Sequence, residues 1–384
     1  MKILIIHTAY RFKGGEDSVV ESEKKLLQEN GHDVYSLIFE NPANPVKALA
    51  LFFIALFNPV SYFKVIKAIN VFQPDVIHVH NWHFAASPSI FRAARGKKIP
   101  VIYTLHNFRL LCPSGILFHQ GKLFLNSLQQ SFPWGAVKKK VYRNSILQTF
   151  WLAFVVWFHH KTGTWNKVDK YIALTSFSKD LFLSSKFVDF AHKIIVKPNF
   201  TRADKLLNVK RQSDIFLFIG RLSEEKGIDC LLEAVKLTGL ELKIGGNGPL
   251  IDSIKDISRK YSNIQYLGNL EKMQVQQFMQ ECTALIFSSI WYETFGLVVI
   301  EAFSQGLPVI ASNIGAMSSM IKDGYNGLLF EAGNSADLQA KLIKWQNKSQ
   351  EEKEQFSKNA YQTYLDNYTP EQNITQLMVI YDSV

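Results

Sequence analysis

The hydrophobic pattern at the start of the chain passes from a short apolar run to an amphipathic stretch. Residues 2–10, KILIIHTAY, have the continuous apolar character of a buried parallel strand. A Gly-Gly turn follows, and a helical period then relates Val19, Val20, Glu23, Leu26 and Leu27, of which all but Glu23 are apolar. Asp17 or Ser18 can cap this helix, and Gly31 ends it.

The same alternation continues through both halves of the chain. In the first half it predicts further strands at residues 32–39, 74–80, 99–106 and 168–175. In the second half it predicts a helix at 249–261 and strands at 215–221, 241–246, 263–268, 283–289 and 307–312. Strands that alternate with helices predict a doubly wound parallel sheet in each half, and therefore an α/β fold.

A polar and basic stretch at residues 196–214 separates the two series. A chain of 384 residues is also too long for one core and is typical of two domains. We therefore expect an N-terminal domain over residues 1–200 and a C-terminal domain over 201–365. The polar tail is expected to be helical, with residues 366–384 returning toward the N-terminal domain and packing across the two.

Two stretches, residues 48–57 and 146–158, are strongly apolar, and the second follows a basic segment at 138–145. Each is shorter than the ~20 residues that a membrane-spanning helix needs. They can be core helices or interfacial helices with aromatic side chains among lipid headgroups, and the sequence leaves both interpretations open.

The net charge of +10 is concentrated in the first half of the chain. Residues 1–200 carry 25 Lys and Arg against 11 Asp and Glu, whereas residues 201–384 carry 18 against 22. Such a basic half favours an anionic partner, for which a membrane surface, a phosphorylated substrate and nucleic acid are the candidates. Nothing in it resembles a nucleic-acid recognition module, so no nucleic-acid partner is expected.

The cysteines and the N-terminus indicate a reducing compartment. Cys112, Cys230 and Cys282 lie far apart and form neither a disulfide framework nor a CxxC metal pair. The first residues are predicted to be a strand rather than a signal peptide. We therefore expect a cytoplasmic protein.

Three glycine turns follow predicted strands, where parallel α/β folds bind ligands. Gly14 and Gly15 allow the backbone to approach a phosphate at a helix N-terminus. Arg221 and Lys226 follow a strand in the second half, and two cations there suit a diphosphate. Gly246 lies in a further strand-to-helix turn. Each of these segments is also compatible with an ordinary turn, and no GxGxxG or P-loop motif occurs.

The segment WYETFGLVVIE places two carboxylates beside an apolar helix. Glu293 precedes a helix predicted from about Gly296, and Glu301 lies on its second turn. Glutamate is rarely buried without a partner, so the two carboxylates form either a solvated rim or a ligand site. The intervening apolar residues are expected to anchor the helix in the core: Leu297, Val298, Val299 and Ile300.

Histidines gather in HVHNWH, as His78, His80 and His83. Histidine is the commonest metal ligand, but no nearby carboxylate completes a set and no Asp-x-Asp occurs, so no metal is expected. His106 closes a predicted strand at its carboxyl end and is the better candidate for a functional histidine.

Together, GRLSEEKG (220–227), the Glu-x7-Glu at 293–301, EAFSQGLPVIAS and DGYNGLLF resemble the retaining glycosyltransferases of family 4. GGED (14–17) and TLHNFRLLCPSG (104–115) resemble the bacterial capsule, exopolysaccharide and O-antigen branch of that family. The similarity covers nearly the whole chain. It implies the GT-B fold, in which two Rossmann-like domains face each other across a cleft, the first binding the acceptor and the second the nucleotide sugar.

The resemblance implies a role for each matching residue. Arg221 and Lys226 would neutralise the departing diphosphate, and Glu293 would hold hydroxyls of the donor sugar. Glu301 would bind the ribose, and His106 the sugar near the reacting carbon. The full implied sets are the catalytic residues His106, Arg221, Lys226 and Glu293, and the donor-binding residues Gly14, Gly15, Gly220, Gly246, Leu267, Phe295, Gly296, Leu297 and Glu301.

One loop departs from the family pattern. Where a Gly-Gly-x-Pro-Glu is usual, this chain has Gly315 to Ser319, GAMSS, so a ligand contact from that loop is not carried over. Cations and a helix dipole replace a metal in such enzymes, and no cofactor is expected.

The resulting prediction is a metal-independent retaining hexosyltransferase of cell-surface polysaccharide synthesis. It would move a sugar from a nucleotide-sugar donor to a glycan acceptor, expected to be lipid-linked. The basic half would hold it peripherally on the inner, anionic face of the cytoplasmic membrane. The alternatives are a sugar phosphorylase or epimerase of the same fold, or a non-catalytic membrane-docking subunit.

Overall fold

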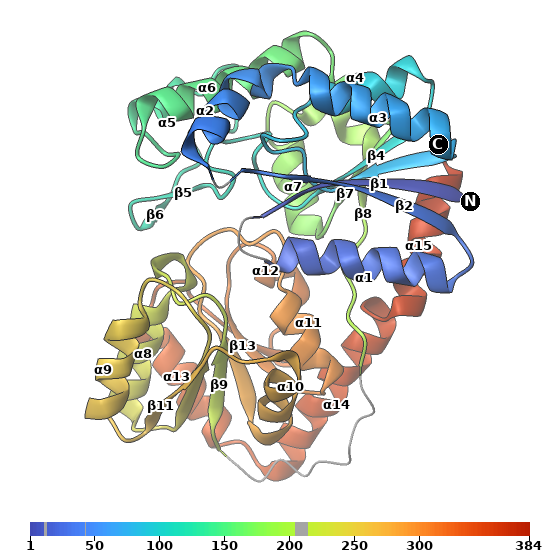
Figure 1. The fold of residues 1–384 in the computed structure, drawn as a ribbon. Helices are drawn as coiled ribbons and strands as arrows, with labels where there is room; N and C mark the ends of the chain where they lie inside the picture. Colours follow the sequence, from blue (N-terminus) through green and yellow to red (C-terminus); the bar gives the residue numbers. More distant parts are fainter. Residues whose placement is uncertain (11–13, 43, 204–213) are drawn as a thin grey trace. The chain divides into compact units, whose positions relative to one another are not determined.

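The computed structural model describes residues 1–10, 14–42, 44–203 and 214–384. The chain divides into two compact units (Figure 1). Unit 1 consists of Met1–Leu117, Phe124–Pro198 and Asn373–Val384, and unit 2 of Phe118–Leu123 and Asn199–Gln372. Of the stretch at 196–214 where we expected the domain change, residues 204–213 lie outside the described residues.

Unit 1 contains a six-stranded parallel sheet in the order β2-β1-β3-β4-β7-β8. Its strands are β1 (Lys2–Ala9), β2 (Asp33–Glu40), β3 (Val76–Val79), β4 (Val101–Leu105), β7 (Lys170–Ala173) and β8 (Ile194–Val196). All were predicted except β8, whose short apolar run gives a weak signal at the sheet edge.

The helices of unit 1 are α1 (Gly15–Glu29), α2 (Pro45–Phe53), η1 (Ile54–Leu56), α3 (Pro59–Phe72), α4 (Ser89–Gly96), α5 (Trp134–Lys138), α6 (Ile146–Lys161), η2 (Trp165–Lys167), α7 (Ser176–Leu183) and η3 (Val188–Lys193). The predicted start of α1 at Asp17 or Ser18 is wrong, because the helix begins at Gly15. The N-cap is Gly14, and Asp17 is the third residue of the helix, where its carboxylate accepts the Gly14 N–H at 2.8 Å.

Unit 2 contains a second six-stranded parallel sheet, in the order β11-β10-β9-β12-β13-β14. Its strands are β9 (Phe216–Ile219), β10 (Leu242–Gly245), β11 (Ile264–Gly268), β12 (Ala284–Phe287), β13 (Val309–Ser312) and β14 (Gly327–Phe330). A short antiparallel hairpin consists of β5 (Phe118–His119) and β6 (Lys122–Leu123). The two six-stranded parallel sheets with helices around them confirm the predicted fold class.

The helices of unit 2 are η4 (Glu224–Lys226), α8 (Ile228–Thr238), α9 (Ile251–Lys260), α10 (Lys272–Glu281), α11 (Leu297–Ser304), α12 (Met317–Met320), α13 (Ser335–Gln346) and α14 (Gln350–Asn367). The polar tail is helical as predicted and ends in α15 (Pro370–Asp382). The end of α15 belongs to unit 1, where Leu377, Ile380 and Tyr381 pack with Ile3 and Ile5 of β1.

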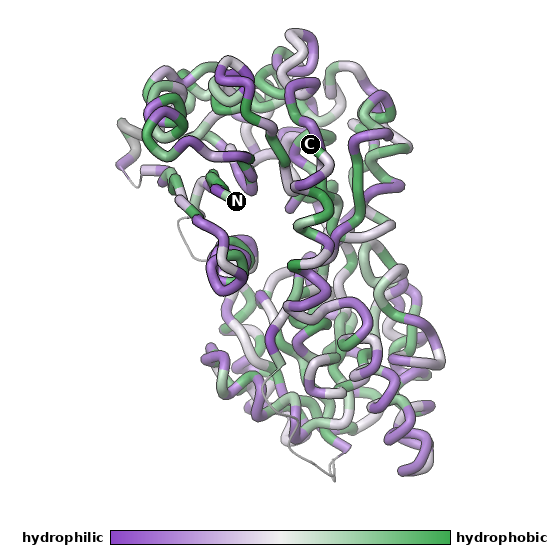
Figure 2. Tube along the Cα trace, turned by 90° about the vertical axis from the view of Figure 1, so that its right-hand side faces the viewer, coloured by the Kyte–Doolittle hydropathy of each residue, from purple (hydrophilic) through white to green (hydrophobic). Residues whose placement is uncertain are grey.

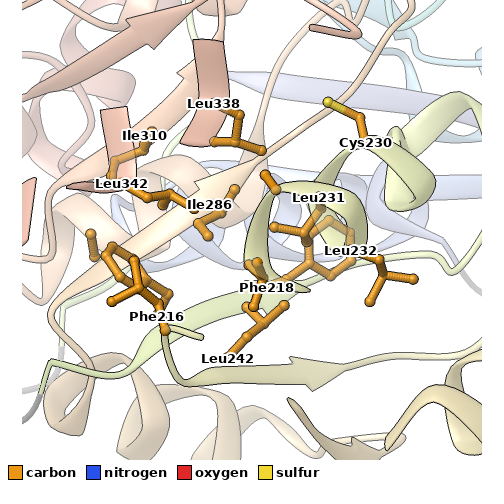
Figure 3. Packing of buried hydrophobic residues seen from close by; sticks show 14 of the residues in the cluster. Phe216, Phe218, Cys230, Leu231, Leu232, Leu242, Ile286, Ile310, Leu338 and Leu342 are labelled. Atoms are coloured by element: carbon orange, nitrogen blue, oxygen red, sulfur yellow. The ribbon is translucent and has the colours of Figure 1, made fainter. Parts of the chain in front are cut away.

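Each sheet carries its own apolar core. In unit 2, Phe216, Leu242 and Ile286 of the strands pack against Leu231 of α8 and Leu338 of α13 (Figure 3). Figure 2 shows hydrophobic and hydrophilic residues alternating along the trace. Burial of these apolar faces on the sheets is the main stabilising contribution to such layered folds.

The apolar stretch at 146–158 forms most of α6, which is mainly a core helix. It buries Leu152, Val155 and Val156, whereas Ile146 and Leu147 at its start are exposed. Among the described residues, no single helix is long and apolar enough to cross a membrane. By length and composition, one bent pair of segments, Ala50–Leu56 and Pro59–Phe72, passes that test.

Two glycines of unit 2 share a left-handed backbone but not their surroundings. Gly227 ends η4 with φ +66°, and a Cβ built there would lie 1.9 Å from the Ser288 carbonyl oxygen. Gly239 ends α8 with φ +68°, and a Cβ there would meet nothing within 4 Å. The loop after β12 can therefore approach η4 only because residue 227 has no side chain.

We expect Gly239→Ala to lower the free energy of unfolding by about 1–2 kcal/mol, the cost of a left-handed backbone. Gly227→Ala should cost about 1–3 kcal/mol more, because it adds an overpacked contact to the same strain. Urea unfolding of both variants measures this difference. Equal losses would show that the close approach to Ser288 contributes nothing.

Candidate functional site

A cavity of about 280 Å³ lies at the carboxyl ends of β9, β10 and β11. It is lined by Ile219, Gly220, Arg221, Gly245, Gly246, Asn247, Asn269, Leu270 and Val275. The predicted residues Gly220, Arg221 and Gly246 therefore line the same cavity. Arg221 is exposed. Ligands bind at this edge in open parallel sheets, because the strand-to-helix loops gather there.

The close approach of two loops shapes this cavity. Gly246 has φ +144°, and a Cβ there would lie 1.8 Å from the Gly220 carbonyl oxygen. The loops after β9 and β10 therefore touch through backbone alone. The predicted donor-binding residue Leu267 lies on β11, whereas Asn269 and Leu270 line the cavity wall beyond that strand.

An ion pair joins the loop after β9 to the loop after β12. Lys226 Nζ donates to Glu293 Oε1 at 2.5 Å, with both side chains largely buried. The same Oε1 accepts the Trp291 Nε1–H at 2.6 Å and the Ser289 hydroxyl at 3.0 Å. Lys226 also lies 5.3 Å above the Trp291 ring. None of these bonds uses Oε2 of Glu293.

The loop that departs from the family pattern supports Glu293 through backbone. Gly315 has φ +61°, and a Cβ there would lie 2.9 Å from the Glu293 nitrogen. The Ala316 N–H donates to the Glu293 carbonyl at 3.1 Å. Although GAMSS replaces the usual sequence, its glycine lets the loop pack directly beneath Glu293.

Glu301 lies on α11, whose N-terminus follows the Glu293 loop. Burial raises the pKa of its carboxyl to about 7, and the charge of Lys272 opposes this only in part. Desolvation disfavours the charged form of a carboxyl, so a ligand that donates hydrogen bonds would stabilise it. The structure thus places a partly desolvated acceptor on the helix that follows the ion pair.

The residues between the two glutamates are mixed in exposure. Phe295 is buried, with its ring centroid 6.1 Å from that of Tyr368. Gly296 precedes the first residue of α11. Val299 and Ile300 anchor α11 in the core as predicted, but the prediction for Leu297 and Val298 is wrong because both are only half-buried. Leu297 and Val298 are the first two residues of α11, before the buried residues Val299 and Ile300.

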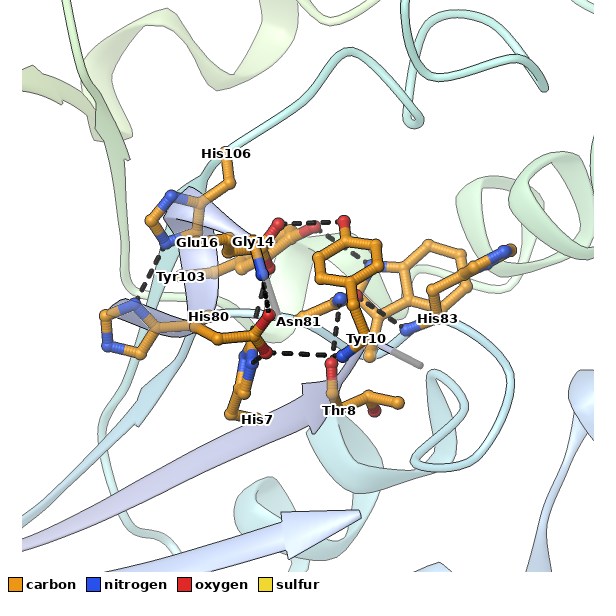
Figure 4. A network of polar contacts seen from close by, with 12 residues as sticks. His7, Thr8, Tyr10, Gly14, Glu16, His80, Asn81, His83, Tyr103 and His106 are labelled. Carbon is orange, nitrogen blue, oxygen red and sulfur yellow. Dashed lines mark hydrogen bonds and ion pairs between the residues drawn. The ribbon is translucent and has the colours of Figure 1, made fainter. Parts of the chain in front are cut away.

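The predicted residues of unit 1 lie at the carboxyl edge of the first sheet (Figure 4). Gly14 caps α1 and Gly15 begins it. His106 follows β4, and its Nε2 lies 3.0 Å from Nδ1 of His80. Burial and the neighbouring His80 hold the pKa of His106 well below its usual range, so its ring is neutral at neutral pH.

A buried ion cluster lies beside these histidines, and its composition was not predicted from the sequence. Glu23 Oε2 accepts from Lys197 Nζ at 3.1 Å. Its Oε1 lies 3.0 Å from His78 Nδ1 and 3.2 Å from His80 Nε2. Burial alone would raise the pKa of Glu23, but Lys197, His78 and His80 outweigh it and lower that pKa well below its usual value.

Glu23, His78 and His80 are also the one group of potential metal ligands found among the described residues. Glu23 supplies the carboxylate that is missing near HVHNWH in the sequence. Lys197 already supplies a positive charge to Glu23, and His78 Nδ1 is hydrogen-bonded to the Tyr381 hydroxyl at 2.8 Å. A divalent cation would have to compete with both, so the cluster fits a structural ion network better than a metal centre. His83 lies apart, with Nε2 3.3 Å from the Tyr142 hydroxyl.

Three further polar residues at this edge were not predicted: His7, Tyr10 and Glu16. His7 Nε2 and Asp17 Oδ1 are 2.8 Å apart, and the Tyr10 hydroxyl donates to Glu16 Oε2 at 2.8 Å. The available signal was their position in the sequence, since His7 lies near the end of the first strand and Glu16 lies within GGED.

Comparison with known proteins identifies the architecture and then the family. A solved structure of HepE from Anabaena in complex with UDP-glucose superposes with a TM-score of 0.68 at 17% identity, covering 100% of both chains. The two six-stranded sheets thus have the GT-B fold. Residues 13–205 match the model of Glycosyltransferase Family 4, and residues 199–363 match Glycosyl transferases group 1. The chain belongs to glycosyltransferase family 4.

Two relatives illustrate the range of similarity. An uncharacterized 41.2 kDa protein from the cps region of Klebsiella pneumoniae is 25% identical over 93% of this chain and 95% of its own length. An uncharacterized glycosyltransferase of Methanocaldococcus jannaschii is 36% identical, but over only 33% of this chain and 36% of its own length.

We expect Glu301→Gln to raise the melting temperature by a few degrees at neutral and alkaline pH. The folded protein holds the Glu301 proton up to a pKa of about 7, whereas the unfolded chain loses it near 4.5. Wild-type stability therefore falls as pH rises through this window, and the amide avoids the loss. Melting curves at several pH values test this.

The exposed Glu354→Gln serves as the matched control and should show no such pH-dependent difference. A gain in Glu301→Gln that stays the same at every pH would rule out desolvation of the Glu301 carboxyl as its cause.

Proposed function

We propose that this glycosyltransferase moves a hexose from a nucleotide-sugar donor to a lipid-linked glycan, with retention of configuration and without a metal. The observation that carries the proposal is that the segment after β9 holds both Arg221, which lines the cavity, and Lys226, which pairs with Glu293. This arrangement combines cations for a diphosphate with a carboxylate for sugar hydroxyls on one sheet edge. HepE, which shares the fold, is described in complex with UDP-glucose.

The chemistry follows from where charge develops. When the bond between sugar and diphosphate breaks, negative charge grows on the leaving group. Arg221 and Lys226 would stabilise that charge, and the N-terminus of α11 would add its dipole. Glu293 Oε2 would accept sugar hydroxyls while its Oε1 stays bound to Trp291 and Ser289. Attack from the same face needs no nucleophilic side chain.

Glu301 and His106 complete the proposed roles. The Glu301 carboxyl would accept hydrogen bonds from the two ribose hydroxyls. These hydrogen bonds would replace the hydration that the carboxyl loses on burial. His106, neutral at working pH, would hydrogen-bond the sugar near the reacting carbon. The Gly14–Gly15 backbone at the start of α1 would approach the diphosphate, because helix N-terminal amides favour anions.

The acceptor side of the proposal is supported by an apolar and basic surface on unit 1. Helices α2, α3, α5 and α6 lie on one side of the first sheet (Figure 1). They expose the apolar residues Phe53, Val60, Phe63, Trp134, Ile146 and Leu147. They and the segment between α5 and α6 also expose the basic residues Lys64, Lys67, Lys138, Lys139, Lys140 and Arg143. Aromatic residues flanked by cations suit an anionic lipid surface.

We expect Lys226→Ala and Glu293→Ala each to lower kcat by about 10²–10³-fold, the usual loss when a group that stabilises transition-state charge is removed. The donor is chosen first, as the nucleotide sugar that most raises the melting temperature of the wild type. Release of nucleoside diphosphate then measures turnover.

Lys243→Ala is the matched control, because Lys243 pairs with Glu281 at 3.4 Å outside the ion pair and cavity. The assay contains EDTA, and loss of wild-type activity there would contradict metal independence alone. Full activity in Lys226→Ala or Glu293→Ala would contradict the site. Phosphate-dependent turnover without an acceptor would favour a phosphorylase, and nucleotide binding without turnover a non-catalytic subunit.

We expect Phe63→Ser to weaken binding to vesicles containing phosphatidylglycerol by about tenfold, since it removes a large exposed apolar side chain. Co-sedimentation at about 0.1 M salt measures the partition, which should fall as salt screens the basic residues. Met273→Ser is the control, because Met273 is 81% exposed on α10 of unit 2. Failure of the wild type to bind would remove the membrane part of the proposal.

A further inference from the structure

Two buried polar atoms at the carboxyl end of β1 have no hydrogen-bond partner among the described residues. They are Oε1 of Glu16 and Nδ1 of His7. The side chain of Glu16 is 9% exposed and that of His7 is 3% exposed. Buried polar groups are nearly always paired, because an unpaired one keeps the full cost of its desolvation. Two such atoms side by side therefore indicate something that binds them.

The distance between these atoms suits a bridging atom. Glu16 Oε1 and His7 Nδ1 are 3.9 Å apart, too far for a direct hydrogen bond. A single oxygen lying to one side of the line that joins them could be within hydrogen-bond distance of both. The separation therefore suits one bridging hydroxyl group or water.

The bonds around His7 fix which nitrogen carries its proton. Oδ1 of Asp17 accepts the Tyr10 backbone N–H at 3.2 Å, and Oδ2 accepts that of Gly14 at 2.8 Å. Asp17 thus acts as an acceptor, and His7 Nε2 donates to its Oδ1 at 2.8 Å. Burial lowers the pKa of His7, so the ring is neutral and Nδ1 is left as an acceptor.

Glu16 supplies the complementary donor. Its Oε2 accepts from the Tyr10 hydroxyl at 2.8 Å, which leaves Oε1 to carry any proton. Burial raises the pKa of Glu16 to about 8, so the carboxyl is mostly protonated at neutral pH. A hydroxyl group that reaches both atoms would accept a hydrogen bond from the protonated Glu16 carboxyl and donate one to Nδ1 of His7. An anion lacks the hydrogen that His7 Nδ1 requires.

We propose that Glu16 and His7 form a binding subsite for one carbohydrate hydroxyl at the carboxyl edge of the first sheet. Figure 4 shows both beside Tyr10 and Gly14. The inference rests on the proposed function, which supplies two sources of that hydroxyl: the acceptor glycan and the donor sugar. In either case the subsite discriminates between ligands by hydrogen bonding. A ligand analogue without that hydroxyl would leave Glu16 Oε1 and His7 Nδ1 unpaired.

Other charged and titratable groups face Glu16 from the neighbouring elements. Asp17 lies on the same helix, His7 on β1, Tyr103 on β4 and Arg109 in the loop that follows. Asp17 raises the pKa of Glu16, and Arg109 and the Tyr10 hydrogen bond lower it, but burial has the largest effect. Glu16 is therefore the group whose ionisation is expected to control the subsite above neutral pH.

The test compares three variants of the full chain. Glu16→Leu removes the donor, Glu16→Gln keeps a donor that cannot ionise, and Glu21→Gln on the exposed face of α1 is the control. The first arm measures calorimetric binding of the chosen nucleotide sugar and of its free nucleoside diphosphate. The second measures binding of octyl glycosides of glucose, galactose and N-acetylglucosamine in the presence of that diphosphate.

We expect Glu16→Leu to weaken the binding of either the nucleotide sugar or the octyl glycoside about tenfold. This is the effect of losing one hydrogen bond to a buried partner. Weaker nucleotide-sugar binding with unchanged diphosphate binding identifies the hydroxyl as the donor's. Weaker octyl glycoside binding identifies it as the acceptor's. Wild-type affinity for that ligand should fall as pH rises through about 8, because an ionised Glu16 would be a second acceptor facing His7.

The pH dependence separates this role from a purely structural one. Glu16→Gln should bind with little change at neutral pH and lose the alkaline fall, whereas Glu21→Gln should keep the wild-type profile. Unchanged affinities in Glu16→Leu, or the same alkaline fall in Glu16→Gln, would overturn the subsite and leave a buried water as the bridging atom. If the wild type binds no nucleotide sugar, that result would instead contradict the proposed function. The role of Glu16 would then still be tested by comparing octyl glycoside binding of the wild type and Glu16→Leu.

Discussion

A charge removed from water must find a partner, and this constraint organises both units of the protein. In unit 2, Lys226 and Glu293 meet at 2.5 Å and join the loops that follow β9 and β12. In unit 1, Glu23 holds Lys197 on one oxygen and lies against two histidines on the other. Both pairs lie at the carboxyl ends of parallel strands or just behind them. Breaking either pair would leave an uncompensated, largely buried charge, which is costly.

Glycines decide how closely the loops of unit 2 come together. Residues 227, 246 and 315 each have a positive φ, and a Cβ at each would overlap or crowd a neighbouring backbone. The loops consequently touch through main chain, and their charged side chains are displayed on a framework with little freedom. Preorganised groups of this kind stabilise charge without reorganising during reaction. The glycines at 227, 246 and 315 are therefore required for the close packing of these loops.

Hydrophobic periodicity was enough to predict the fold class and most strands, because each sheet is buried on both faces and gives continuous apolar runs. It missed β8 and β14 at the edges of the two sheets and misplaced the start of α1, where glycine rather than a polar side chain precedes the helix. It also assigned Leu297 and Val298 to the core, although only Val299 and Ile300 are fully buried there. Edges and helix ends depend on a few local contacts, which periodicity does not report.

The sequence by itself determined the two α/β series, the family and the order of candidate residues along the chain, since these depend on local pattern and spacing. Tertiary structure alone decided which of those residues meet. Glu23 and Lys197 are 174 positions apart, and Lys226 and Glu293 are 67 apart. The helical period placed Glu23 on the same helix face as Val19, Val20, Leu26 and Leu27 but did not indicate its partner. Sheet order brings such distant side chains together, and only the fold reveals that Glu16 Oε1 and His7 Nδ1 lie 3.9 Å apart, both without a hydrogen-bond partner among the described residues.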